Sequence, residues 1–189
     1  PSIYVSGQQD TLLSSSWLEK QVIIDGRMTS SNEWSDSRPI ELQLNSENSN
    51  DSPYSAKMWS KNDETWLYFL IRIVSPLRGT DPPACAAQID YFWGPFDDPW
   101  TNFDITTLNC DGYPWDGYGY NTDDPIIDTL HSPPGENNLE GYVTHDGTYY
   151  WFEFRKPLDS GDGYDWSFET GKVYGLRTRN PDTGGFMSL

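Results

Sequence analysis

TWLYFLIRIVS, from Thr65 to Ser75, carries the clearest strand pattern in this sequence. Side chains in a β-strand point alternately to the two faces of the sheet. One face would carry Trp66, Tyr68, Leu70 and Arg72. The opposite face would carry Leu67, Phe69, Ile71 and Ile73. Because both faces are largely apolar, we expect this strand to lie at the centre of a sheet that is covered on both sides.

The neighbouring segments predict further strands. YSAKMWS lies upstream, and the turn residues Lys61-Asn62-Asp63-Glu64 between the two segments predict a hairpin. A second hairpin is predicted in LEGYVTHDGTYYWFEFRKPL, with its turn at His145-Asp146-Gly147. Strands are also predicted in KQVIIDGRM, RPIELQLNS and AAQIDYFWG, and as two short pieces of YDWSFETGKVYGLRTRN around Thr170-Gly171. DTLLSSSWLEK is predicted to form one short helix.

Gly and Pro interrupt these patterns every few residues, with 16 Gly and 14 Pro in the chain. Many short strands separated by turn residues are typical of an all-β sandwich. We therefore predict an antiparallel, jelly-roll-like β-sandwich with one long acidic and aromatic loop between Pro95 and about Pro125. Residues 22–189 would form this single domain, and residues 1–21 an N-terminal extension.

The long loop contains FDDPWTNFDITTLNCDGYPWDGYGYNTDD, residues 96–124, with seven Asp, seven aromatic residues and no Lys or Arg. Loops of this length are uncommon in compact domains and are usually functional. The whole chain has a net charge of −17, and residues 79–154 contain fourteen acidic residues without a Lys or Arg. This charge argues against a nucleic-acid partner, which requires a cationic face. Divalent cations would relieve the repulsion between the carboxylates.

Calcium is the cation that these residues favour, because it takes six to eight oxygen ligands from carboxylates, amides and carbonyls. No stretch has the spacing of an EF-hand loop, so the site would be irregular. The alternative for each Asp is a turn former whose carboxylate accepts backbone N–H groups. The candidate ligands are Asp97, Asp98, Asp104, Asp111, Asp116, Asp123 and Asp124 in the loop, and Asp159 and Asp162, followed by Asp165, in PLDSGDGYDW.

Aromatic residues of the same region are candidates for stacking on the faces of sugar rings. They are Trp93, Trp100, Trp115 and Tyr118. The alternative is that these rings form a small core beneath the loop. Catalysis has little support, since no catalytic motif is present and the two histidines, His131 and His145, lie apart. We therefore predict a protein without enzymatic activity.

The two cysteines, Cys85 and Cys110, flank part of the loop. A disulfide between them would contribute about 3–4 kcal/mol of stability by restricting the unfolded chain. Paired cysteines are typical of secreted proteins. The sequon Asn50-Asp51-Ser52 and a first residue other than Met also favour a processed, extracellular or cell-surface protein. No stretch is long and apolar enough to span a membrane.

Four segments in this order resemble the DOMON-like type 9 superfamily. They are VIIDGRMTSSNEWSDSRPIEL, AKMWSKNDETWLYFLIRI, AAQIDYFWG and DGTYYWFEFRKPLDSGDGYDWSFETGKVYGL. The shared pattern is Ile-Asp-Gly with a Trp nearby, a strand with Leu-Tyr, an Asp-bearing strand and a late Glu-x-x-x-Pro-Leu. The superfamily includes family 9 carbohydrate-binding modules and the haem-binding subunit of ethylbenzene dehydrogenase-like enzymes. The resemblance implies a β-sandwich, often with calcium, that binds sugars or b-type haem.

Haem in these relatives is held by a Met and a Lys, for which Met58 and Lys156 are the only candidates near the family motifs. A strand Met is more often a core residue, so haem b is not expected here. The prediction is a secreted, calcium-stabilised protein for adhesion or self-assembly, as a filament or layer subunit. The strand SIYV near the N-terminus would complete the sheet of a neighbouring copy, or else pair within its own chain. The alternatives are a carbohydrate-binding module and a b-type haem electron-transfer domain.

Overall fold

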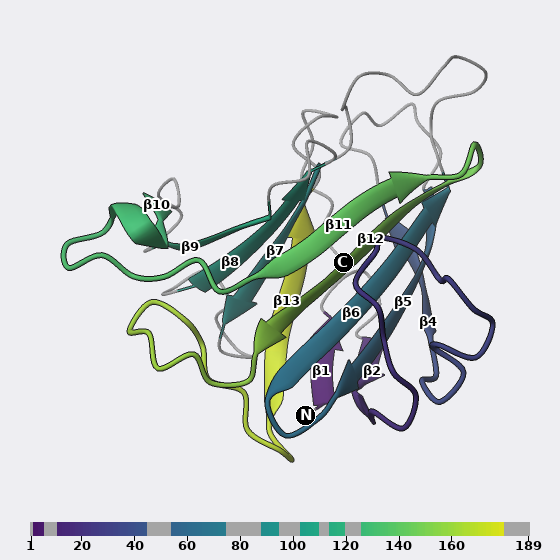
Figure 1. Ribbon diagram of the computed structural model, residues 1–189, viewed down its shortest axis with the longest axis horizontal. Coiled ribbons are helices and arrows are strands. Elements are labelled where there is room, and N and C mark those ends of the chain that lie inside the picture. The colour runs from purple at the N-terminus through teal and green to yellow at the C-terminus, as the bar shows by residue number, and fades with distance from the viewer. Residues whose placement is uncertain are drawn as a thin grey trace.

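Two β-sheets face each other in the computed structural model, which describes residues 2–5, 11–44, 54–74, 88–94, 103–109, 114–119 and 126–179 (Figure 1). One sheet has the order β10 (Ile126–Ile127), β9 (Trp115–Gly119), β8 (Phe103–Asn109), β7 (Gln88–Gly94), β13 (Val173–Arg179), β1 (Ser2–Val5) and β2 (Thr11–Ser14). The other has the order β11 (Glu140–His145), β12 (Tyr149–Pro157), β6 (Trp66–Val74), β5 (Tyr54–Asn62) and β3 (Ser16–Trp17). Strand β4 (Ile40–Leu44) also pairs with β5. This architecture confirms the predicted all-β sandwich.

Strand β6 confirms the prediction made from its alternating side chains. It lies between β12 and β5, with antiparallel pairing on both sides. Its Leu67, Phe69, Ile71 and Ile73 side chains belong to the main core between the sheets. Tyr68 and Leu70 point to the other face, where they form a second buried cluster. Both hairpins were also predicted correctly, since β5–β6 turns at Asp63–Thr65 and β11–β12 at Asp146–Thr148.

The prediction of one long loop over residues 95–125 is wrong in one respect, because this segment contains strands β8 and β9. Strand β8 is buried on both faces, with Phe103 and Ile105 on one side and Leu108 in the main core on the other. Asp and Gly are depleted in strands, which is why the sequence pattern predicted a loop here. Tertiary burial overrides that preference.

Other local predictions were also wrong. Residues 11–17 form strands β2 and β3 in place of the predicted helix, and residues 20–28 run irregularly in place of a strand. Residues 164–169 form no strand before β13. The helix that the described residues do contain is the short 3-10 helix η1 (Asp128–Leu130). No helix in the described part of the chain is long and apolar enough to cross a membrane.

The N-terminal segment supplies strands to both sheets of its own chain. Strand β1 pairs in parallel with β13 and antiparallel with β2, as the second of the two predicted alternatives requires. Leu13 is fully buried in the main core. Strand β3 pairs in parallel with β5, so the sandwich contains two parallel pairs among antiparallel ones. Exchange of β1 between subunits remains a prediction.

A long irregular segment, residues 18–38, covers the outer face of the six-stranded sheet and follows the purple loops at the right of Figure 1. Trp34 is its buried anchor and packs with Trp59, Tyr68 and Leu70. Glu153 of β12 holds the segment from beneath. Its carboxylate accepts hydrogen bonds from Trp34 Nε1 (3.1 Å), Asp25 N (2.9 Å) and Gly26 N (3.0 Å). In the pattern quoted for the superfamily resemblance, the Asp-Gly and the Trp therefore both donate hydrogen bonds to the carboxylate of the late Glu.

Candidate functional site: a buried acidic cluster

A group of buried charged residues lies between the two sheets, centred on Lys156. Lys156 lies on the face of β12 that points between the sheets and is fully buried. Its ammonium contacts Asp104 of β8 and lies 3.8 Å from Asp116 Oδ1 of β9 and 3.4 Å from Asp165 Oδ1. Asp104 and Asp116 are fully buried as well. One ammonium thus faces three carboxylates where water is excluded.

Burial and mutual repulsion perturb the ionisation of this group. Burial raises the pKa of Asp104 to about 6, although Lys156 opposes this increase. Burial also raises the pKa of Asp116 well above its usual range, against the attraction of Lys156. For Lys156, burial alone would lower the pKa, but the carboxylates of Asp104, Asp116 and Asp165 raise it above its ordinary value. The cluster therefore stabilises the charged form of Lys156. Its carboxyl groups bind protons more readily than the same groups do in water.

A second group of carboxylates adjoins the first. Asp128 of η1, Asp162 and Asp165 bring carboxylate oxygens within 4.8 Å of one another. Asp128 is fully buried, and neither of its carboxylate oxygens has a hydrogen-bond partner. The imidazole of His131 lies nearby, with Nε2 4.0 Å from Asp128 Oδ1. Burial, followed by the charges of Asp165 and Asp104, raises the pKa of Asp128 to about 7.

The three members of this second group differ in their existing partners. Asp165 contacts Lys156 through one oxygen and accepts a hydrogen bond from Asn138 Nδ2 (2.9 Å) through the other. Asp162 accepts backbone N–H groups of Glu136 (2.6 Å) and Tyr164 (2.9 Å). Asp128 has none. Asp128 and Asp162 are therefore the carboxylates best placed to hold a cation, whereas the Asp104, Asp116 and Asp165 group already encloses the Lys156 ammonium.

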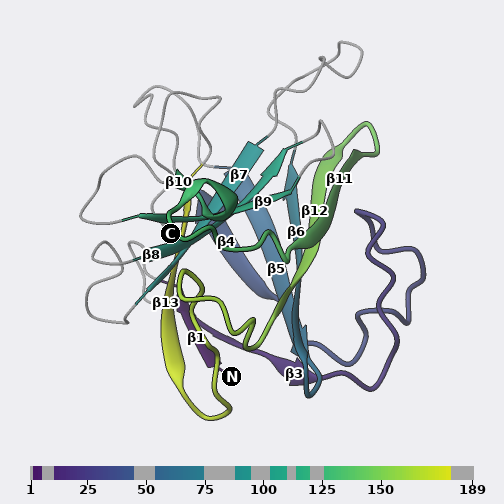
Figure 2. The same cartoon turned by 60° about the vertical axis from the view of Figure 1, so that its left-hand side comes forward.

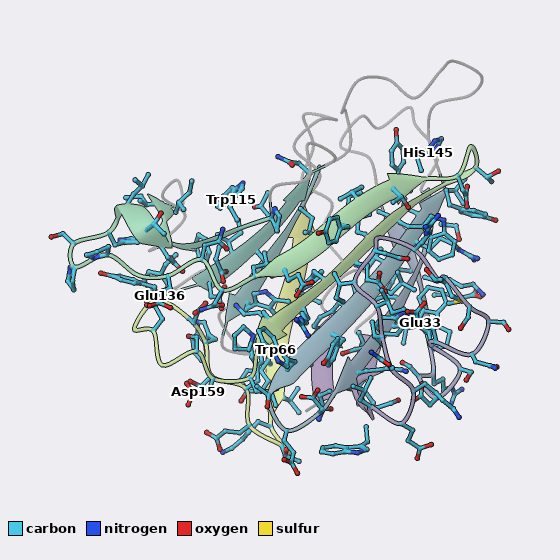
Figure 3. All side chains as sticks on the ribbon, viewed as in Figure 1. Glu33, Trp66, Trp115, Glu136, His145 and Asp159 are labelled. Carbon is cyan, nitrogen blue, oxygen red and sulfur yellow. The ribbon has the colours of Figure 1, made fainter. Side chains whose placement is uncertain are left out.

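A pocket of about 490 Å³ opens beside Asp162. Its lining residues include Glu136, Ser160 and Tyr164, together with residues 133–135. Tyr164 donates a hydrogen bond to the carbonyl of Pro133 (2.9 Å) and stacks on His131 with ring centroids 4.2 Å apart. In Figure 3, Glu136 and Asp159 mark the two loops that border this end of the molecule, far from His145 at the opposite end.

The predicted calcium ligands have separate locations. Asp104 and Asp116 lie on strands with Lys156, and Asp162 lies at the pocket. Asp159 is exposed and accepts hydrogen bonds from Gly161 N (3.1 Å) and Ser167 Oγ (3.1 Å), which is the turn-forming alternative. The remaining predicted ligands lie outside the described residues: Asp97, Asp98, Asp111, Asp123 and Asp124.

Of the predicted sugar-binding aromatics, one is fully buried and two are half-buried in the described part of the chain. Trp93 is fully buried in the main core and donates through Nε1 to Thr106 Oγ1 (3.2 Å), so neither ring face reaches solvent. Trp115 is half-buried against Phe103 and Ile105. Tyr118 is half-buried with its ring edge-on to Tyr164, 5.8 Å between centroids, beside the pocket. Trp100 lies outside the described residues, as do Cys85 and Cys110, and the predicted disulfide between these cysteines stays a prediction.

The predicted haem ligands occupy other environments. Met58 is fully buried in the main core of the sandwich. The Lys156 amino group contacts carboxylates within the sandwich. Sequence reasoning also missed Asp128, which follows two Ile residues and is followed by Thr129 and Leu130. An acidic residue with no Gly, Pro or Asn within two positions is the signal that would have singled it out.

Comparison with known proteins adds a set of distant structural likenesses. No protein-family model matches the chain, and no curated protein sequence matches it. A family 9 carbohydrate-binding module from Caldicellulosiruptor kristjanssonii, solved with glucose, is 14% identical over 87% of this chain and 76% of its own, with a TM-score of 0.49. The cellotriose complex gives 14%, 87%, 75% and 0.47.

A third similar structure is that of a candidate carbohydrate-binding protein from Bacteroides uniformis. It is 9% identical over 65% of this chain and 61% of its own, with a TM-score of 0.44. Family 9 modules are among the proteins that the sequence motifs resemble.

Proposed function

We propose that this chain is a non-catalytic, extracellular binding module that holds Ca²⁺ at Asp128 and Asp162 and a glycan in the adjoining pocket. The observation that carries the proposal is the Asp128 carboxylate, which is buried without a hydrogen-bond partner. A buried polar group without a partner costs stability, and an ion supplies the missing interaction. Hard cations such as Ca²⁺ take carboxylate and carbonyl oxygens.

The pocket beside Asp162 supports a polar ligand rich in hydroxyl groups. Its lining residues include the acidic Glu136 and Asp162, the hydroxyl-bearing Ser160 and the aromatic Tyr164. Ligand sites commonly pair a ring surface with a few polar groups that fix orientation. Calcium at Asp162 would hold the two pocket-forming loops in place, so glycan binding would depend on calcium.

The test begins with protein freed of metal by EDTA and dialysis. Calcium is titrated by isothermal titration calorimetry, and an array of soluble polysaccharides is then probed in calcium and in EDTA. The proposal expects calcium binding that Asp128→Asn abolishes. It also expects glycan binding that is lost in EDTA and weakened at least tenfold by Glu136→Gln. Glu64→Gln changes an equally exposed Glu in the β5–β6 turn and is the matched control.

Two results would overturn the proposal. If the wild type does not bind calcium, the proposed metal site is excluded. If glycan binding is unchanged by EDTA and by Glu136→Gln, the glycan does not bind in this pocket. Light scattering in the same titration tests the self-assembly predicted from the sequence. Large particles that form in calcium and dissolve in EDTA, without glycan binding, would replace the module with an assembly subunit.

A further inference from the structure

Lys156 and Asp104 bring an amine and a carboxyl group into direct contact from opposite sheets. Both side chains are buried, with exposed fractions of 1% and 0%. The Asp116 carboxyl lies 3.8 Å from the same nitrogen, and neither of its oxygens has a hydrogen-bond partner. We propose that Lys156 and Asp104 condense into an intramolecular amide bond, with Asp116 transferring the proton. This inference does not depend on the proposed function.

The reaction balances without any co-reactant. Asp116 first takes one proton from the Lys156 ammonium, and the neutral Nζ then attacks Asp104 Cγ, so that a C–N bond forms and one C–O bond breaks. The ammonium loses two protons, and both leave with the departing Asp104 oxygen as one water molecule. Asp116 takes a proton from the nitrogen and returns it to the departing oxygen, so it ends unchanged. No atom is oxidised or reduced.

Burial favours this condensation over the ion pair. Holding an ammonium and a carboxylate away from water costs several kcal/mol per ion in general, whereas the amide product is neutral. Burial also raises the pKa values of Asp104 and Asp116, which brings a protonated carboxyl group within reach at neutral pH. The backbone N–H of Trp166 donates to Asp104 Oδ2 (3.1 Å) and orients the carboxyl group.

The chain contains its own reference pair. Lys61 is equally buried and contacts Asp36, but its ammonium also donates to the carbonyls of Glu33 (2.6 Å) and Lys20 (3.2 Å). Asp36 accepts the backbone N–H groups of Glu19 (3.0 Å) and Lys20 (2.9 Å). Burial opposes the effect, but Lys61 and these donors lower the pKa of Asp36. Within the described residues no second carboxylate contacts Lys61 to transfer a proton.

The bond would join strand β8 of one sheet to strand β12 of the other, between residues 52 positions apart. A covalent link between distant residues stabilises a fold by restricting the unfolded chain. Here the link crosses the core and ties the two layers together. It would also resist force that pulls the sheets apart, which suits a protein exposed outside the cell.

The test is the intact mass of the purified, denatured and fully reduced full-length chain, followed by peptide mapping. The proposal expects a mass one water below that of the sequence and a branched peptide that links residues 104 and 156. Lys156→Met should restore the full sequence mass, and Asp116→Asn should slow formation at least tenfold. The pair Lys61 and Asp36 should remain unlinked in the same digest.

Three results would overturn the proposal. The first is an unchanged mass in wild-type protein kept at neutral pH for days, which decides the question even if Lys156→Met does not fold. The second is a lost water that maps to a cyclised Asp-Gly step such as Asp25-Gly26, since that product has the same mass. The third, linkage at an unchanged rate in Asp116→Asn, would overturn the role of Asp116.

Discussion

Strand β12 carries two buried charged residues, Glu153 and Lys156, that meet contrasting surroundings. Glu153 faces the outer layer, where three N–H donors from Asp25, Gly26 and Trp34 satisfy both of its oxygens. Lys156 faces the interior between the sheets, where one ammonium serves three carboxylates and both oxygens of Asp116 lack a hydrogen-bond donor. The two residues are only three positions apart.

The Glu153 network has a structural role, whereas the cluster around Lys156 is a candidate site for chemistry or binding. A fully satisfied buried network specifies one arrangement of the chain, and the Glu153 network fastens residues 18–38 to the sheet in this way. In an incompletely satisfied network, some buried oxygens accept no hydrogen bond and can still bind an ion, a proton or a ligand. The acidic cluster around Lys156 and Asp128 has that capacity, and it lies beside the pocket. The following changes test whether this distinction holds.

Removing the Glu153 carboxylate should have the largest effect. Glu153→Ala leaves the N–H groups of Asp25, Gly26 and Trp34 buried without acceptors, and each unmet donor costs about 1–3 kcal/mol. We expect a loss of about 5 kcal/mol in the free energy of unfolding, measured by urea denaturation. Glu140→Ala removes an exposed carboxylate from the neighbouring strand, where it pairs with Arg155. A loss of similar size in both variants would contradict the role given to the Glu153 network.

Removing the Lys156 ammonium should have the next largest effect. Compared with wild-type protein in which the Lys156–Asp104 amide has not yet formed, Lys156→Met leaves Asp104, Asp116 and Asp165 buried without their cation, and breaking a buried pair typically costs about 3–5 kcal/mol. We expect a loss of about 3 kcal/mol at pH 8, at the lower end of that range. The loss should shrink as the pH falls to 5 and the carboxylates bind protons. Urea denaturation at both pH values measures this, and a loss that grows in acid would contradict it.

Neutralising Asp128 should raise the stability of the metal-free protein. Burial raises the pKa of Asp128 to about 7 and that of Asp104 to about 6, both above the unfolded values near 4. Groups with raised pKa values favour the folded state at low pH, and this contribution disappears as the pH rises through the folded pKa. In EDTA, wild-type stability should therefore fall between pH 5 and 8.

Asp128→Asn removes one of these ionisations without changing the shape of the side chain. In EDTA at pH 8 we expect its free energy of unfolding to exceed that of the wild type by about 1 kcal/mol, with little difference at pH 5. Calcium should stabilise the wild type and leave the variant unchanged. Melting curves with and without calcium measure both effects. A variant less stable than the wild type in EDTA at pH 8 would show that Asp128 supports the fold.

The smallest effect is expected on the outer surface. The ion pair between Arg155 and Glu140 is partly exposed, with side-chain exposed fractions of 32% and 45%. Such pairs contribute about 0–1 kcal/mol, so Glu140→Ala should cost about 0.5 kcal/mol, and less in high salt. Urea denaturation at low and high salt measures the difference. A larger loss of stability that does not depend on salt would show that Glu140 belongs to a buried, satisfied network like that of Glu153.

Hydrophobic alternation was the reliable part of the sequence signal. It predicted β6, both hairpins and the sandwich, because the two faces of a strand must match the two sides of a sheet. It failed at β8 and β9, whose Asp104 and Asp116 interrupt the pattern with residues that rarely occur in strands. Their burial depends on Lys156, which is 52 positions from Asp104. A local pattern carries no information about such a partner.

The candidate site divides in the same way. Composition alone establishes the excess of carboxylates, the scarcity of compensating cations and the preference for hard metal ions, since charge and ligand type do not depend on the fold. The packing of the two sheets establishes which carboxylates lose their water, which contact Lys156 and that the Asp128 carboxylate accepts no hydrogen bond. Desolvation depends on what packs around a group, and that packing exists only once the two sheets have closed on each other (Figure 2).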